Sequence, residues 1–148
     1  MKKFLFYLIQ WTWALPQNIA GAVLLLILGR NVTHFGFGGA LVTLADEHPL
    51  LRDRGSVSLG MFVFLNVAPS TESGRMVLIH EYGHTIQSLF LGPLFFPVIG
   101  IPSVIWAELY SKRKSVYKLK GLGYTSRFPE NSASQLGERV TGDRAMNW

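Results

Sequence analysis

Apolar residues dominate the start of the chain, and a short polar break divides them. The run over residues 4–28 is long enough to cross a bilayer, but residues 16–18 (Pro-Gln-Asn) interrupt it. The pattern allows either one kinked spanning helix or two short helices that meet at Pro16 as a re-entrant hairpin. Proline suits the first turn of a helix, which favours the second arrangement. No convincing small-residue cleavage site follows, so we expect residues 1–30 to be retained as a hydrophobic helical anchor.

Glycines and strand-forming residues replace this pattern over residues 31–68. The segment 57–64 reads Val-Ser-Leu-Gly-Met-Phe-Val-Phe and is bounded by Gly55 and Pro69. A turn is expected over residues 46–55. The pattern therefore predicts a β-hairpin or a small sheet in this part of the chain.

The next segment has the start and stop signals of a helix, which we predict over residues 72–92. Thr71 or Ser73 is available as the N-cap. Gly92-Pro93 is a common way for a helix to end. The chemistry described below falls on this helix.

The chain then alternates between apolar and polar character. Residues 93–109 are apolar, but Pro97, Gly100 and Pro102 interrupt them, so we expect a bent or re-entrant element there. A polar helix is predicted over residues 128–142, with a proline in its first turn and a glycine at its end.

Composition changes the picture by pointing to a lipid-facing surface. Apolar residues make up 49% of the 148 residues and charged residues 16%, which is unusually apolar for a soluble domain. The length leaves room for a single domain, taken as residues 1–148. The expected fold class is therefore an α+β membrane protein, with short or re-entrant hydrophobic helices, a small β-sheet and the helix over 72–92.

Charge adds an orientation to this picture. The net charge is +5, and residues 109–129 contain no Asp or Glu. The basic residues of this stretch are Lys112, Arg113, Lys114, Lys118, Lys120 and Arg127. Beside apolar segments, such a cluster together with Lys2 and Lys3 is typical of a cytoplasmic membrane face with anionic lipids. We therefore expect a cell-membrane location with the site on the cytoplasmic side, a lipid bilayer as partner and no nucleic acid.

The candidate chemistry lies in the sequence His80-Glu81-Tyr82-Gly83-His84. Histidines four residues apart lie on one face of a helix and can share a metal. The chain has no cysteine, so a metal must be held by histidines and carboxylates. The apolar flanks make unpaired imidazoles costly, which favours bound Zn²⁺ over a chance coincidence. In such a motif Glu81 is the general base that takes a proton from the attacking water and delivers it to the leaving amine.

A zinc site of this kind needs a third protein ligand. The candidates are His34, His48 and a carboxylate such as Asp46 or Glu130. Glu130 is the best of them, because it opens a predicted helix and could complete a His-His-Glu ligand set. The alternative is that Glu130 is a solvated carboxylate that the helix dipole favours in a first turn.

These motifs resemble those of the gluzincin metallopeptidases, above all their membrane branch of prenyl-protein and heat-shock-type proteases. In that branch His-Glu-x-x-His is followed by Glu-x-x-Ala-Asp. The stretch from His80 to His84 matches the first motif, and Glu130 with Ala133 matches the second. Ser134 stands where the family usually has an Asp that supports a metal-bound His, so it either weakens the site or supplies the hydrogen bond through its hydroxyl. The chain is also similar to small bacterial membrane proteins in the stretch that begins at His80.

The resemblance also implies a place for substrate. In gluzincins a strand before the catalytic helix forms the rim of the cleft and pairs with extended substrate. On this basis we expect substrate binding at Leu59, Gly60, Met61 and Phe62, although an ordinary strand packed on the helix would have the same sequence. A tyrosine can stabilise an oxyanion, and the sequence singles out none of the candidates Tyr82, Tyr110 and Tyr124.

The expected function is that of a membrane-embedded zinc endopeptidase that cuts membrane-proximal peptides or membrane proteins. One alternative is a non-catalytic membrane scaffold with a structural or vestigial zinc site, in which Ser134 marks lost catalysis. Another is a membrane-surface adaptor without metal. The change Glu81→Gln separates the first from the others, because it should keep zinc and abolish cleavage.

Overall fold

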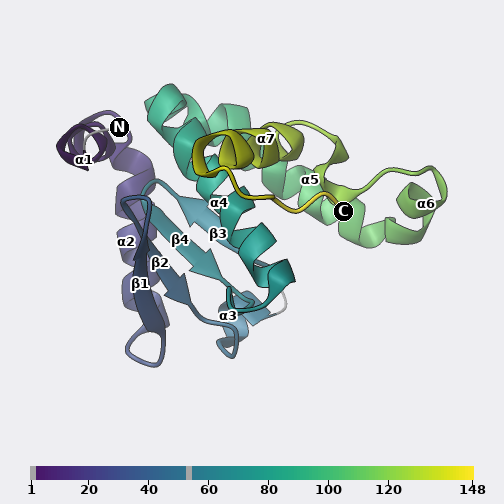
Figure 1. Cartoon of the computed structure of the whole chain (residues 1–148), viewed down its shortest axis with the longest axis horizontal. Helices are drawn as coiled ribbons and strands as arrows, with labels where there is room; N and C mark the ends of the chain where they lie inside the picture. Colours follow the sequence, from purple (N-terminus) through teal and green to yellow (C-terminus); the bar gives the residue numbers. More distant parts are fainter. Residues whose placement is uncertain (1–2, 53–54) are drawn as a thin grey trace.

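The computed structural model describes residues 3–52 and 55–148. Lys2 of the predicted basic N-terminus and residues 53–54 of the predicted turn lie outside the described residues. Within the described part the fold is α+β, as expected, and joins helices to a small mixed sheet (Figure 1). The helices are α1 (Lys3–Thr12), α2 (Leu15–Leu28), α3 (Pro49–Arg52), α4 (Glu72–Leu91), α5 (Ile101–Lys112), α6 (Lys114–Leu119) and α7 (Glu130–Thr141). The strands are β1 (Thr33–Phe37), β2 (Ala40–Leu44), β3 (Val57–Leu59) and β4 (Phe62–Leu65).

The apolar start of the chain forms two helices, α1 and α2, that meet at 90°. Pro16 lies in the first turn of α2, where its missing N–H is not needed. The break that the sequence suggested is therefore a junction between two helices. In the described residues, no single helix has the length and apolar character to cross a bilayer; the bent pair satisfies both criteria together. A membrane crossing stays a prediction.

The four strands form one sheet in the order β1-β2-β4-β3. β1 and β2 are antiparallel, β2 and β4 are parallel, and β3 pairs antiparallel with β4. The strand-rich segment 57–64 is divided by a tight turn at Gly60, whose φ of 63° is one that glycine adopts readily. The segment therefore forms two strands, and β3 is the one at an edge of the sheet.

The sheet is covered on both faces, by α2 on one and α4 on the other (Figure 1). Because side chains alternate along a strand, Phe62 and Phe64 of β4 pack in the cluster with α2, and Val63 and Leu65 pack in the cluster with α4. All four are buried. This explains why β4 is apolar throughout rather than alternating with polar residues.

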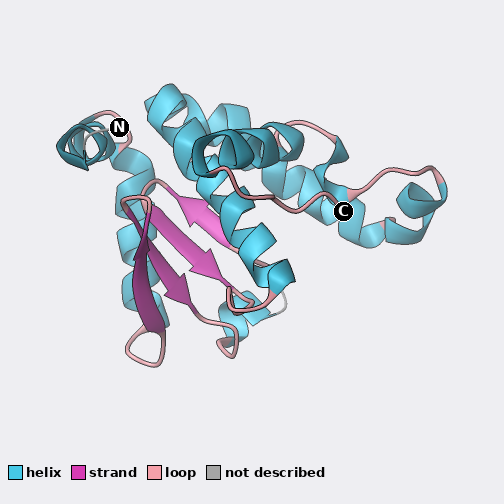
Figure 2. Ribbon diagram, viewed as in Figure 1, coloured by secondary structure: helices cyan, strands magenta, loops and turns pink. Residues whose placement is uncertain are grey.

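The second half of the chain returns to α4. After Leu91 the chain makes a 3₁₀ turn (Gly92–Leu94) and a π-helical turn (Phe96–Gly100) before α5 begins. The predicted broken element is therefore present, although α5 itself is a regular helix. α7 then packs against α4, which is the most extensive contact between helices of the described residues (Figure 2).

Candidate metal centre

The middle of α4 carries the motif residues and is buried. Thr71 caps the helix, since its side chain accepts a hydrogen bond from the Gly74 N–H at 3.0 Å. Every residue from Leu78 to Ser88 is buried, because the sheet and α7 both cover this part of the helix. Of the two predicted N-cap candidates, Thr71 is confirmed, and the motif lies in the buried part of the helix.

Two glycines let α4 and α7 approach closely beside the motif. A Cβ atom at Gly83 would collide with the carbonyl oxygen of Ala133, and one at Gly137 would collide with that of Ile79. A larger residue at either position would push the helices apart. The close approach places Glu130, the first residue of α7, against the histidines of α4.

The structure brings together His80, His84 and Glu130. Oε2 of Glu130 lies 3.0 Å from Nε2 of His80 and 3.4 Å from Nε2 of His84. All three residues are buried, and their potential ligand atoms lie within 4.8 Å of one another. Ligand atoms around a tetrahedral zinc, with bonds of about 2.0–2.1 Å, are roughly 3.3 Å apart. The spacing therefore suits a single ion of this size.

The hydrogen bonds on the far side of His80 show which ring nitrogen carries the proton. The Ser134 hydroxyl donates to the Met146 carbonyl at 2.9 Å, so the Ser134 oxygen accepts from the imidazole. That oxygen lies 2.9 Å from Nδ1 of His80. His80 therefore donates through Nδ1 and, when neutral, presents the Nε2 lone pair to Glu130.

His84 is held in the same way by a different residue. Gln87 directs its Nε2 donor to the Pro129 carbonyl at 3.3 Å and the Ser132 hydroxyl at 2.7 Å. Its Oε1 is thus left to accept from Nδ1 of His84, 2.7 Å away. The Nε2 lone pair of His84 also faces Glu130.

Two imidazole lone pairs and a carboxylate oxygen consequently converge on one buried point. Such groups repel one another unless a proton or a metal cation lies between them. A tautomer fixed by an outer hydrogen bond is the usual arrangement for a metal-binding histidine. Two nitrogen donors and one carboxylate oxygen, placed this closely, fit a cation such as Zn²⁺.

The pKa values of the three candidate ligands are shifted by burial and by their contacts with one another. Burial lowers the pKa of His80. Burial alone would raise the pKa of Glu130, but hydrogen bonds with His80 and His84 hold it well below its usual range. Burial likewise would lower the pKa of His84, but the hydrogen bond and charge of Glu130 raise it. The carboxylate thus stays charged and attracts a cation.

Glu81 differs from Glu130 in both position and protonation. It lies on α4 between the two histidines, is buried, and has no side-chain hydrogen bond among the described residues. Burial raises its pKa to about 7, with His84 opposing and Glu130 adding to the shift. A carboxylate near neutrality can exchange protons at physiological pH.

A cavity of about 360 Å³ opens beside the site. Glu81, His84 and Glu130 line its polar end. One wall comes from β3 and the residue before it, and the other comes from residues 95–105. The position enclosed by the three ligand atoms is therefore open on the side of the cavity. A catalytic zinc needs such an open side for a water or a substrate.

The structure separates the three candidate tyrosines, which the sequence does not. Tyr124 lines the cavity, and its ring centroid lies 6.4 Å from that of His80. Burial raises the pKa of Tyr124, with Glu130 and Glu81 adding to the shift, so the phenol keeps its proton. Tyr82 instead donates to the Gly38 carbonyl at 2.7 Å, and Tyr110 stacks on Tyr117.

The sequence reasoning missed two further polar residues of the site. Ser103, at the start of α5, donates to Oε1 of Glu130 at 2.5 Å. Gln87 fixes His84 through its side-chain oxygen. Gln87 lies one helical turn after His84 and could have been suspected from that spacing, whereas Ser103 depends on how residues 92–102 bend.

The other expected ligands lie elsewhere. His34 on β1 contacts the Thr43 hydroxyl at 3.0 Å, and His48 accepts from the Leu50 N–H at 3.3 Å. Neither these histidines nor Asp46 belongs to the metal-ligand group found in residues 3–52 and 55–148. The structure thus places Glu130, among the candidates, beside the motif histidines.

The four expected substrate residues divide between two places. Leu59, at the end of β3, lines the cavity. Gly60 forms the turn, the Met61 N–H donates to Oδ1 of Asn18 at 2.8 Å, and Phe62 packs in the cluster with α2. These three do not line the cavity, because the tight turn directs the chain back into the sheet.

Fold and site together define a small α+β protein with a buried His-His-Glu group that could hold a metal ion. Comparisons with protein-family models, with curated proteins and with solved structures find no match to this chain. The resemblance to gluzincins therefore rests on the motifs and the ligand geometry alone.

Proposed function

We propose that this protein is a zinc-dependent endopeptidase that acts on membrane-proximal peptides or membrane proteins. The observation that carries the proposal is the grouping of His80, His84 and Glu130 beside a cavity that two of them line together with Glu81. Structural zinc sites are usually closed by four protein ligands, whereas catalytic sites use three and leave one position open. The group found in the described residues has three ligands and an open side.

The chain supplies the groups that peptide hydrolysis needs. Zinc held there would polarise the scissile carbonyl and make an attacking water more acidic. Glu81 takes the proton of that water and passes it to the leaving amine, a role that a pKa of about 7 supports. The Tyr124 phenol, protonated at the edge of the cavity, can donate to the oxyanion.

The edge strand β3 supports a peptide as the substrate. It is paired with β4 on one side, and no other backbone partner is found for it in the described residues. Val57, Ser58 and Leu59 all line the cavity. An extended peptide could add to this edge by main-chain hydrogen bonds and bring its carbonyl to the metal.

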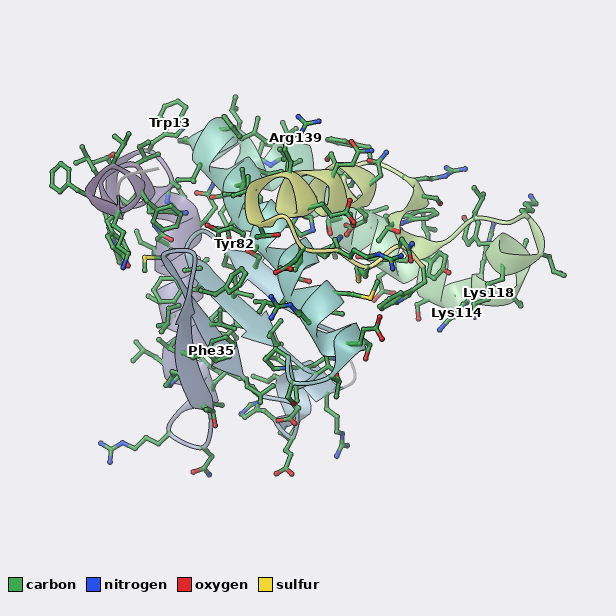
Figure 3. The ribbon with its side chains drawn as sticks, viewed as in Figure 1. Trp13, Phe35, Tyr82, Lys114, Lys118 and Arg139 are labelled. Carbon is green, nitrogen blue, oxygen red and sulfur yellow. The ribbon has the colours of Figure 1, made fainter. Side chains whose placement is uncertain are left out.

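Exposed apolar residues support a membrane-associated location. The bent pair α1 and α2, with the junction between them, exposes eleven large hydrophobic side chains, and their contact with water is unfavourable. They are Phe4, Leu5, Tyr7, Leu8, Trp11, Trp13, Leu15, Ile19, Val23, Leu26 and Ile27. Tryptophans are typical of the membrane–water interface. The prediction of a cytoplasmic face is based on the basic cluster. Two of its residues, Lys114 and Lys118, lie on α6, at the far end of the molecule from Trp13 (Figure 3).

A non-catalytic scaffold with a structural or vestigial zinc site is the second candidate. This candidate is based on Ser134, which stands where gluzincins usually have an Asp. The Ser134 oxygen lies 2.9 Å from Nδ1 of His80 and accepts a hydrogen bond from it. The hydroxyl thus provides the hydrogen bond expected of the Asp in gluzincins, which supports an active site over a vestigial one.

Zinc content is the first test of the proposal. Wild type, His84→Ala and Glu130→Ala would be purified in detergent, dialysed against a weak chelator and analysed for metal. We expect one zinc per chain in the wild type and none in either variant. Zinc retained by Glu130→Ala would contradict the ligand set.

Cleavage of an unfolded test protein separates the two candidates. We expect the zinc-loaded wild type to cut it and Glu81→Gln to retain zinc without cutting, because the base is lost. A Glu81→Gln variant that cuts as well as wild type would refute the mechanism. A zinc-loaded wild type that cuts neither this protein nor membrane-inserted peptides would favour the scaffold.

A further inference from the structure

The cavity beside the metal site changes character along its length. Its polar end is formed by two of the candidate metal ligands, His84 and Glu130, together with Glu81 and Tyr124. The rest is lined mainly by apolar side chains of residues 95–105. Val57 and Leu59 also line it, with Ser56 and Ser58 beside them. A pocket of this size with one polar end and apolar walls is typical of a binding site that orients one ligand.

The apolar walls continue from the interior to the surface. Phe95 and Ile99 are buried, at 3% and 2% exposure, whereas Val104 and Ile105 are 65% and 54% exposed. All four line the cavity. A ligand therefore meets apolar side chains at the mouth as well as at depth.

Charge is confined to the metal end of the cavity. Within the described residues no Lys or Arg lines it, and the carboxylates that do are Glu81 and Glu130. A charged side chain that entered the apolar part would lose its hydration without finding a partner. A large uncharged side chain would gain by leaving water.

We propose that the cavity selects one large uncharged side chain, aliphatic or aromatic, of an extended peptide that lies along β3. A charged side chain at the same peptide position is excluded. The choice of a peptide as ligand rests on the proposed peptidase function. The preference for an apolar side chain rests on the walls from residues 95–105.

The test measures binding without cleavage, on the zinc-loaded Glu81→Gln protein in detergent. The probes are fluorescently labelled Ala-Ser peptides in which a single Leu or a single Asp occupies each position in turn. Fluorescence anisotropy gives the dissociation constants, and zinc is measured in the same samples. At one position we expect Leu to bind at least about tenfold more tightly than Asp, equal to about 1.4 kcal/mol.

A charge placed at the mouth shows where the selectivity arises. Val104→Lys, added to Glu81→Gln, changes an exposed side chain and should leave the fold intact. We expect the Leu and Asp peptides to bind this variant with about equal affinity. The added lysine makes burial of the Leu side chain less favourable and attracts the Asp side chain. Val140→Lys, at a residue of α7 that is 52% exposed and does not line the cavity, is the matched control. It should leave the preference unchanged.

The outcomes separate this inference from the proposed function. Equal binding of Leu and Asp peptides at every position, or equal effects of Val104→Lys and Val140→Lys, would overturn the inference even if zinc is bound. A sample that binds no zinc but keeps a Leu preference sensitive to Val104→Lys would support the inference and contradict the zinc peptidase.

Discussion

Nδ1 of His80 lies 2.9 Å from the Ser134 hydroxyl, which itself donates to the Met146 carbonyl at 2.9 Å. The Met146 carbonyl thus orients the Ser134 hydroxyl of α7, and that hydroxyl in turn orients the His80 imidazole. The hydroxyl can accept from His80 only because its own proton goes to Met146. His80 is thereby held with its Nε2 lone pair toward Glu130.

Removal of this support should weaken metal binding. Ser134→Ala leaves Nδ1 of His80 without its partner, and loss of such an outer hydrogen bond typically lowers metal affinity by about 10–100-fold. Titration of zinc against a competing chelator measures the change. Ser126→Ala, at an exposed hydroxyl, is the control and should bind zinc as wild type does. Equal affinities for Ser134→Ala and wild type would show that the hydrogen bond does not support the ligand.

A methyl group at the crossing of α4 and α7 should damage both stability and metal binding. The Cβ of Gly83→Ala would meet the Ala133 carbonyl, so the helices must separate. We expect a loss of about 1–3 kcal/mol in the free energy of unfolding, as for other overpacked sites, together with lower zinc content. Gly36→Ala is the control, since its Cβ meets nothing within 4 Å. Denaturant unfolding checks stability, and an unchanged Gly83→Ala would rule out the tight crossing.

The raised pKa of Glu81 predicts an acid limb in the rate of cleavage. A general base must be unprotonated, so kcat/KM should fall as the pH drops below about 7. Bound zinc is positively charged and would move this limb toward lower pH. Profiles of kcat/KM from about pH 5 to 9, with zinc content followed in parallel, test the sign. A rate that rises on acidification while zinc stays bound would exclude Glu81 as the base.

Tyr124 should affect turnover without affecting metal. Tyr124→Phe keeps the ring and removes the donor, and loss of one oxyanion donor typically lowers kcat by about a hundredfold or more. We expect KM and zinc content to change little. Tyr110→Phe, a neighbouring ring that does not line the cavity, is the matched control. A fall in kcat equal to that of the control would indicate a packing role only.

The local features of the site could be predicted because their signals are local. The cap at Thr71, the helix that follows it and the helix that begins at Glu130 each depend on a few neighbouring residues. The spacing of His80 and His84 then fixes their common face. The pattern of its own helix and the resemblance to gluzincins together predict Glu130 as the third ligand.

The features that were missed depend on contacts between distant segments. The parallel pairing of β2 with β4 and the separate strand β3 follow from burial against both α2 and α4, which no local pattern reports. For this reason Met61 and Phe62 pack with α2, and their expected contact with substrate stays a prediction. Tyr124 lines the cavity only because the bent segment after α4 places α5 beside the cavity.

The link from Ser134 to the Met146 carbonyl bears on when the site can form during synthesis. The ribosome makes His80 and His84 well before Glu130, and it makes the helices α1 and α2 earlier still. Glu130 and then Met146 follow much later. A nascent chain that ends after α4 therefore contains the apolar helices and both histidines, but not the carboxylate that completes the candidate ligand set. The hydrogen bond that orients Ser134 toward His80 forms only after the segment around Met146 has emerged and folded back against α7.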